Sequence, residues 1–146
     1  MLPGAYLAFK KNKTAYYRSG ITFQNKHISL GSFASEQDAH QAYVEASHLL
    51  SDFSTTIDNI FLLPTILSFG KAISLLNFRD NHIYFKNPIY LRNNYFVYYL
   101  SPSEELKFDI DDLFYYSSHK IMRRQGHLFV NDYGMQINIL SRYGIK

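Results

Sequence analysis

The sequence predicts an α+β protein: an N-terminal three-stranded antiparallel sheet packed on one helix, followed by a second small α+β unit of helices and β-hairpins. Three observations lead to this prediction. Short stretches before residue 33 alternate apolar and polar side chains, as strands with one buried face do. Residues 39–50 repeat apolar side chains at helical spacing. Turn signals recur between short apolar runs from residue 82 onward.

The first unit is predicted to begin with strands at residues 5–10, 15–24 and 27–30. A polar turn at 11–14 joins the first two strands. The second turn is expected at Asn25–Lys26, because Asn tolerates positive φ. Alternation along the middle strand then places Tyr17, Ser19, Ile21 and Phe23 on one face and Arg18, Gly20, Thr22 and Gln24 on the other.

Ser35 is predicted to begin a helix, because its hydroxyl can cap free N–H groups and Asp38 favours the positive end of the helix dipole. The polar run 51–56 after this helix is the predicted boundary, which divides the chain into domains at 1–53 and 57–146. The apolar stripe of the helix, suited to lying on a sheet, consists of Ala39, Ala42, Tyr43, Ala46, Leu49 and Leu50.

The second unit is predicted to start with a helical segment at 57–78, broken near Pro64 and too interrupted by polar residues to span a membrane. Another helix is expected at 109–124, because acidic residues at its start and basic residues at its end complement the helix dipole. Strands are expected between and after these helices, at 82–85, 89–91, 95–100, 128–130 and 135–140.

Charge is unevenly distributed along the chain. Every charged residue before Glu36 is basic, which gives residues 1–33 a formal charge of +5, whereas the remainder has ten Lys and Arg against twelve Asp and Glu. Such a basic segment favours binding to nucleic acid. A content of 47% hydrophobic and 18% charged residues argues against global disorder, and the absence of cysteine excludes disulfides and thiolate chemistry.

Residues 4–50 combine four motifs: Gly4-Ala5-Tyr6, then Tyr17-Arg18-Ser19-Gly20-Ile21, a Leu-Gly-x-Phe ending within 26–33, and a capped Ala-x-x-Ala-Tyr helix start within 35–43. In this combination the segment resembles the AP2/ERF DNA-binding domain, especially its bacterial and phage members. The resemblance implies a sheet that lies in the DNA major groove. It assigns to the DNA face Tyr6, Ala8, Lys10, Arg18, Gly20, Thr22, His27 and Ser29, positions at which the family places Arg and Trp.

A fainter resemblance rests on Asp109, Asp112, Leu113, Phe114, Ser117, Lys120, Ile121, Gly126 and Leu128. Through these residues, 107–143 is similar to the region of bacterial AP2-linked HNH homing endonucleases in which an Asp-capped helix precedes a Gly-containing hairpin. An HNH site needs a general-base histidine and a metal-binding His or Asn. The sequence has Ile139 to Arg142 where a catalytic His-Arg pair is expected, so we expect no enzymatic activity.

Polar clusters elsewhere give no metal or cofactor prediction. The six histidines are scattered and lack carboxylate support at metal-ligand spacing. Asp109, Asp111 and Asp112 are interpreted as a helix N-terminus rather than as Mg²⁺ ligands. The basic residues Lys120, Arg123 and Arg124 form either a solvated helix end or a second phosphate-contacting patch.

These features predict a noncatalytic, cytoplasmic DNA-binding protein of bacterial, phage or mobile-element origin. Duplex DNA is the expected partner, with phosphate contacts from Lys10, Lys11, Lys13, Arg18 and Lys26, base-edge contacts from Thr22, Gln24 and His27, and an extension at Lys120, Arg123 and Arg124. The alternative is a protein-binding effector, such as a phage-encoded, anti-CRISPR-like inhibitor of a host nucleic-acid enzyme. It is motivated by the scarcity of base-reading arginines and the aromatic-rich second half.

Overall fold

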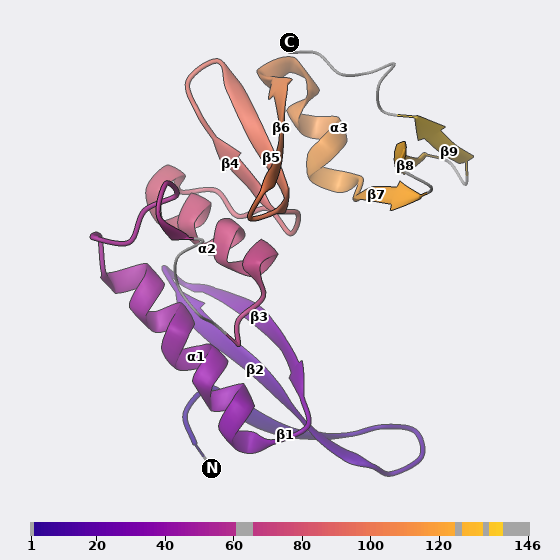
Figure 1. The fold of residues 1–146 in the computed structure, drawn as a ribbon. Helices are drawn as coiled ribbons and strands as arrows, with labels where there is room; N and C mark the ends of the chain where they lie inside the picture. The colour runs from indigo at the N-terminus through magenta and orange to yellow at the C-terminus, as the bar shows by residue number, and fades with distance from the viewer. Residues whose placement is uncertain (1, 61–65, 125–126, 133–134, 139–146) are drawn as a thin grey trace.

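The computed structural model describes residues 2–60, 66–124, 127–132 and 135–138, and it has an α+β fold (Figure 1). The described strands form three three-stranded antiparallel sheets in chain order, β1-β2-β3, β4-β5-β6 and β7-β8-β9. Helix α1 lies on the first sheet, α2 lies between the first and second sheets, and α3 packs beside the second. The predicted layout of a three-stranded sheet with one helix, followed by a smaller α+β unit, is confirmed.

The first sheet contains β1 (Ala5–Phe9), β2 (Ala15–Phe23) and β3 (Lys26–Phe33). The β2–β3 turn differs from the prediction by one residue. Gln24 and Asn25 have φ of 49° and 66°, and Phe23 pairs with Lys26. Two positive φ values are what a tight two-residue hairpin with right-handed twist requires. Gln24 therefore belongs to the turn and Lys26 to the strand.

Helix α1 (Glu36–Ser51) begins as predicted, because Ser35 Oγ accepts a hydrogen bond of 3.1 Å from the backbone N–H of Asp38. Its stripe of small residues permits a close approach to the sheet, and Ser19 Oγ donates to the carbonyl of Ala39 at 2.6 Å. The helix also contacts the chain before β1. Gly4 has φ +78°, and a Cβ there would lie 2.3 Å from the Tyr43 side chain, so only glycine fits.

Helix α2 (Phe69–Asn81) shares one hydrophobic core with the first sheet and α1. The cluster joins Ile28 of β3 and Leu49 of α1 to Leu75 of α2, all nearly inaccessible to solvent. The predicted boundary at residues 53–57 falls in the connection between α1 and α2, and side chains from both sides of it pack together. Whether 1–53 folds as a separate domain stays a prediction.

The buried guanidinium of Arg79, in α2, forms hydrogen bonds to the end of α1. The Arg79 side chain is 3% exposed, and its guanidinium donates to the carbonyl of Leu49 at 2.8 Å, to that of Asp52 at 3.2 Å, and to the carboxylate of Asp80 at 2.7 Å. Asp80 also accepts from the Tyr90 hydroxyl at 2.7 Å. Because two acceptors are carbonyls at the end of α1, Arg79 satisfies groups that the helix leaves without partners.

The second half differs from the sequence-based prediction in several elements. Residues 82–85 do not form a strand, and residues 57–59 form a turn instead of an α-helix. The first predicted helical piece extends into residues 61–65, which lie outside the described residues, as do residues 139–140 of the last predicted strand. The observed strands are β4 (Ile89–Leu91), β5 (Tyr95–Ser101), β6 (Glu104–Asp109), β7 (Ile121–Arg124), β8 (His127–Asp132) and β9 (Met135–Asn138).

The predicted helix at 109–124 is confirmed in part: residues 110–118 are helical, but the segment after residue 118 does not continue the helix. Its beginning is a 3-10 turn, η2 (Ile110–Asp112), followed by a short helix, α3 (Leu113–Ser118), and by β7. Asp109 ends β6 and caps η2 by accepting from the N–H of Asp111 at 3.0 Å, so its predicted capping role is confirmed for a shorter element. Phe108 of β6 is buried against Phe96 of β5, with ring centroids 5.4 Å apart, and this contact stabilises residues 104–109 as a strand of the sheet.

We expect Arg79→Met to lower the free energy of unfolding by about 3 kcal/mol, because it leaves Asp80 and the carbonyl of Leu49 without their buried donor. Chemical denaturation measures this change. Lys86→Met removes an exposed cation and serves as the control, with an expected change within about 0.5 kcal/mol. A stability of Arg79→Met equal to that of the control would contradict the bridging role.

A second expectation concerns alkaline pH. Burial, followed by the nearby Glu105 carboxylate, raises the pKa of Tyr99 to about 12 from an ordinary 10. The folded state therefore holds this proton more tightly, and the resulting stability is complete below pH 10 and lost as pH rises through 12. Tyr99→Phe should remove up to roughly 2 kcal/mol of the decline in unfolding free energy between pH 10 and 12. An equal decline in Tyr99→Phe and in the exposed control Tyr6→Phe would refute it.

Candidate nucleic-acid interface

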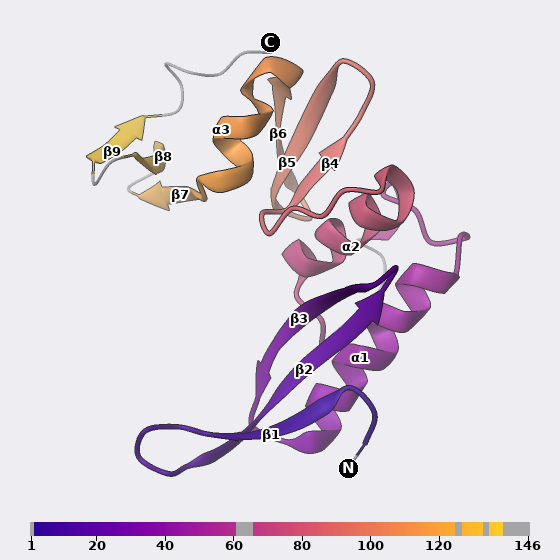
Figure 2. The same cartoon turned by 180° about the vertical axis from the view of Figure 1, so that it is seen from behind.

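One face of the first sheet carries no described element over it. Helix α1 covers the inner face, while Figure 2 shows the other side of β1, β2 and β3 open to view. The predicted alternation along β2 is confirmed, since Ser19 and Ile21 are buried whereas Arg18 and Thr22 are exposed. Strand register groups the outer-face residues as Tyr6 beside Arg18 and Ser32, Ala8 beside Tyr16, Gly20 beside Ser29, and Thr22 beside His27.

Arg18 is held in place on this face by a phenol. Its Nε and Nη2 atoms lie 3.2 and 3.1 Å from the hydroxyl oxygen of Tyr16 and donate to it. The guanidinium carbon also lies 5.8 Å from the centroid of the Tyr16 ring. Within the described residues no carboxylate pairs with Arg18. Its positive charge is thus oriented but not neutralised, which suits a phosphate contact.

Three lysines lie on the hairpin that joins β1 to β2. The loop is closed by the Lys10 N–H donating to the carbonyl of Thr14 and the Lys13 N–H donating to that of Lys10, both at 2.9 Å. Lys13 has φ of 69°, and Asn12 Oδ1 accepts from the N–H of Thr14 at 3.0 Å. Lys10, Lys11 and Lys13 are exposed, and the hairpin extends beyond α1 in both ribbon views (Figures 1 and 2).

The centre of the face is a hollow of about 460 Å³ lined by Tyr6, Arg18, Ser19, His27 and Ser29. His27 covers Gly20, because a Cβ on Gly20 would lie 2.8 Å from the imidazole ring. The His27 ring is positioned by Thr22, whose hydroxyl is 3.3 Å from Nδ1, and by the edge of Tyr6. Hydroxyl and imidazole groups beside an arginine can donate to phosphates and to base edges.

Several predicted contact residues lie away from this face. Gln24 is in the β2–β3 turn, and the Lys26 ammonium lies 5.3 Å from the centroid of the Tyr84 ring, which Lys71 also approaches to 5.3 Å. Because the turn is displaced by one residue, Lys26 is a strand residue. It lies two positions before Ile28 and therefore faces the same, inner side of the sheet. It therefore does not join Arg18 and Lys10.

The basic group at the predicted end of the second helix is also placed differently. Lys120 is exposed just before β7, and Arg123 and Arg124 belong to β7, paired with Leu128 and His127. The side chains of the two arginines lie outside the described part of the structure. The helix-end interpretation of these residues is wrong, because the helix stops at Ser118.

Sequence reasoning missed Tyr16, although a signal for it existed. Residues two apart on a strand share a face, so Tyr16 lies beside Arg18. Elsewhere, the residues that the structure describes contain no group of three His, Cys, Asp or Glu side chains placed to hold a metal ion. Among the described helices none is both long and apolar enough to cross a membrane.

We expect Gly20→Ala to displace the His27 ring and to lower the free energy of unfolding by no more than about 1 kcal/mol, because the clashing ring is exposed and can turn toward solvent. Thermal or chemical denaturation, with the His27 imidazole resonances in NMR, measures both effects. The double variant Gly20→Ala with His27→Ala should recover most of the loss, because the clashing ring is gone. Additive losses in the double variant would show that His27 does not cover Gly20.

A scan of protein-family models and searches of curated proteins and solved structures found no match to this chain. The resemblances of residues 4–50 to AP2/ERF domains and of 107–143 to an HNH region therefore stay predictions. The candidate interface is defined by the geometry of the chain itself: a basic hairpin and one oriented arginine on the open face of a sheet.

Proposed function

We propose that the protein is a noncatalytic DNA-binding protein of bacterial, phage or mobile-element origin that places the outer face of its first sheet on duplex DNA. The observation that carries the proposal is the group of cations on this face and its hairpin, Lys10, Lys11, Lys13 and Arg18, with no carboxylate paired to them in the described residues. Uncompensated cations bind phosphates by releasing condensed counterions.

The shape of the β1–β2 hairpin supports this mode of binding. A two-stranded ribbon fits into the major groove of B-DNA, which is about 12 Å wide. Because the hairpin extends past α1, its lysines can reach phosphates on both sides of a groove without a clash from the helix (Figure 2). Arg18 is the one arginine on the face among the described residues, so most of the affinity should be electrostatic and weakly selective for sequence.

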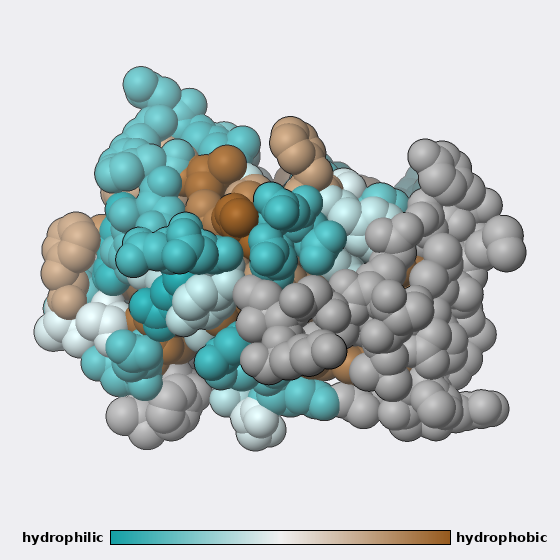
Figure 3. Space-filling model, turned by 90° about the horizontal axis from the view of Figure 1, so that it is seen from above, coloured by the Kyte–Doolittle hydropathy of each residue, from teal (hydrophilic) through white to brown (hydrophobic). Residues whose placement is uncertain are grey.

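The alternative, a protein-binding effector, is favoured by one observation. In η2 and α3, Phe114 is 93% exposed, and Ile110, 38% exposed, lies close by in sequence with the acidic Asp111 between them. Figure 3, which views the end of the molecule that carries the second sheet and α3, shows apolar side chains in small groups separated by hydrophilic ones on the visible described surface. An acidic and aromatic surface of this kind would suit a basic protein partner.

The test of DNA binding is a charge-matched comparison by fluorescence anisotropy with a random-sequence duplex across a salt series. Lys10→Gln with Arg18→Gln should lower affinity at about 50 mM salt by about tenfold or more and reduce the slope of log K against log salt by about 2. The control, Lys86→Gln with Lys107→Gln, removes the same charge from outside the face and should retain the wild-type slope.

Equal slopes for the two double variants would overturn the assignment of the outer face. Absence of wild-type binding to any duplex at about 50 mM salt would overturn DNA binding itself and favour the protein-binding effector, because electrostatic binding is strongest at low salt.

A further inference from the structure

The first strand of the first sheet has an open edge. In the order β1-β2-β3, β1 pairs with β2 on one side and with no described strand on the other. The N–H of Lys10 donates to the carbonyl of Thr14 at 2.9 Å, and the N–H of Gly20 donates to that of Gly4 at 3.1 Å. Hydrogen-bonded pairs alternate along an antiparallel ladder, so the even-numbered residues 4–10 bond to β2. Residues 5, 7 and 9 direct their backbone groups to the open edge.

Most of these edge groups are available to another strand. The N–H of Ala5 donates to the carbonyl of Leu2 at 3.2 Å, but within the described residues Leu7 and Phe9 make no backbone hydrogen bond on this side. Open edges pair readily with other chains, and proteins usually prevent this with charged residues or proline in the strand. β1 has neither, whereas β6, at the edge of the second sheet, carries four charged residues.

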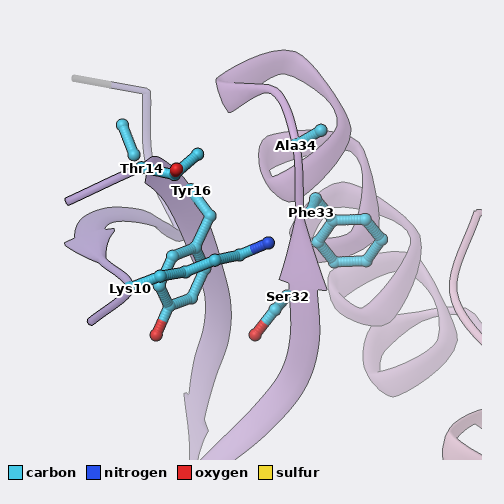
Figure 4. A pocket seen from close by; sticks show the side chains of 7 residues that line it. Lys10, Thr14, Tyr16, Ser32, Phe33 and Ala34 are labelled. Atoms are coloured by element: carbon cyan, nitrogen blue, oxygen red, sulfur yellow. The ribbon is translucent and has the colours of Figure 1, made fainter. Parts of the chain in front are cut away.

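The side of β1 that faces α1 is incompletely covered. Ala5 is buried, but Leu7 and Phe9, on the same side, are 45% and 64% exposed, because the β1–β2 hairpin extends beyond the helix (Figure 1). Figure 4 shows the Phe33 ring on the α1 side of β3, and the register joins Phe33 to Leu7 through Tyr17. An apolar surface thus continues from the core to the open edge, where a partner can cover it.

The sequence of β1, Ala-Tyr-Leu-Ala-Phe, is complementary to itself when a second copy runs antiparallel about Leu7. In that register Leu7 lies opposite the partner's Leu7, Tyr6 opposite Ala8, and Phe9 opposite Ala5. Each ring lies beside an alanine, which leaves room for it to cover the neighbouring strand. The two Leu7 residues exchange both of their hydrogen bonds, and each Phe9 N–H reaches the partner's Ala5 carbonyl.

Charge favours the same arrangement. The partner's chain leaves its β1 at Lys10 and Lys11, alongside residues 2–4 of the first copy. The carboxylate of Glu36 lies beside this segment, because it accepts from the N–H of Leu2 at 2.9 Å. The basic hairpin of each copy therefore meets the acidic first turn of the other copy's α1, which contains Glu36 and Asp38.

We propose that β1 pairs with β1 of a second copy of this chain, so that the two first sheets form one six-stranded antiparallel sheet with Leu7 at the two-fold axis. The pairing is closed, because each copy presents the same edge to the other. An axis perpendicular to the sheet leaves both outer faces on the same side. The inference goes beyond the proposed function and does not rest on it, since association is measured without DNA.

The first test is sedimentation equilibrium of the full chain at concentrations from about 1 to 500 µM. We expect the mass to rise from 17.1 kDa to twice that value and no further. The paired strands are short, so the contact is smaller than the roughly 1,600 Å² of a standard interface, and we expect a dissociation constant of about 10–100 µM. A mass of one chain at every concentration, or growth beyond two chains, would overturn the two-fold pairing.

Leu7→Lys is the discriminating variant, because it places two like charges side by side at the axis. We expect it to weaken dimerisation by about tenfold or more. The control is Ile83→Lys, which adds the same charge at an aliphatic residue of similar exposure, 42%, between α2 and β4. It should keep the wild-type dissociation constant. Equal dissociation constants for the two variants would overturn the assignment to β1.

Cross-linking tests the register and does not depend on the lysine variant being folded. The chain has no cysteine, so Leu7→Cys introduces one thiol per chain. Opposite residues of an antiparallel pair have Cβ atoms about 5 Å apart, so a thiol-specific linker of about that length should join two Leu7→Cys chains. Ile83→Cys is the control and should stay unlinked. A dimer whose Leu7→Cys chains are not joined would overturn the pairing about Leu7.

Discussion

The close contact between α1 and the first sheet determines which surface the protein presents. Ala39, Ala42 and Ala46 are fully buried, so the helix axis can lie near the strands. That contact uses the apolar face of β2 and β3. Since the side-chain period of a strand is two, every residue of opposite parity must then face outward. The composition of the outer face, with Arg18, Thr22 and His27, follows from the packing of alanines on the other side.

The packing of α1 on one face of the sheet also separates the acidic residues of the helix from the basic residues of the outer face. Two acidic residues of α1, Glu36 and Glu45, accept hydrogen bonds from backbone groups of neighbouring segments. Glu36 accepts from the N–H of Leu2 at 2.9 Å, and Glu45 accepts from the N–H groups of Ile66 and Leu67, the shortest bonds being 2.9 Å. These carboxylates are engaged there, and no carboxylate of the described residues forms an ion pair with the lysines of the hairpin or with Arg18.

Much of the first unit could be predicted from the sequence, because its signals are local. Ser35 caps α1 as expected, and the two-residue alternation of β2 identified its buried face. The helix predicted at 109–124 was wrong beyond residue 118, because residues 121–124 pair with β8 as strand β7, and the basic residues there only resemble a helix end. The pairing of Ile121 with Val130 is a contact between separate strands that charge patterns do not reveal. Tyr16 was missed because it lies just before the motif that begins at Tyr17, although it shares a face of β2 with Arg18.

The one-residue displacement of the β2–β3 turn explains why the candidate site is concentrated at one end of the sheet. With the turn at Gln24 and Asn25, Lys26 becomes a strand residue opposite Phe23 and faces inward, toward Tyr84. Its ammonium then lies over an aromatic ring, a contact that stabilises a cation without neutralising it. The end of the sheet near α2 is therefore occupied by contacts within the protein. At the opposite end, the lysines of the β1–β2 hairpin are exposed, and no carboxylate of the described residues pairs with them.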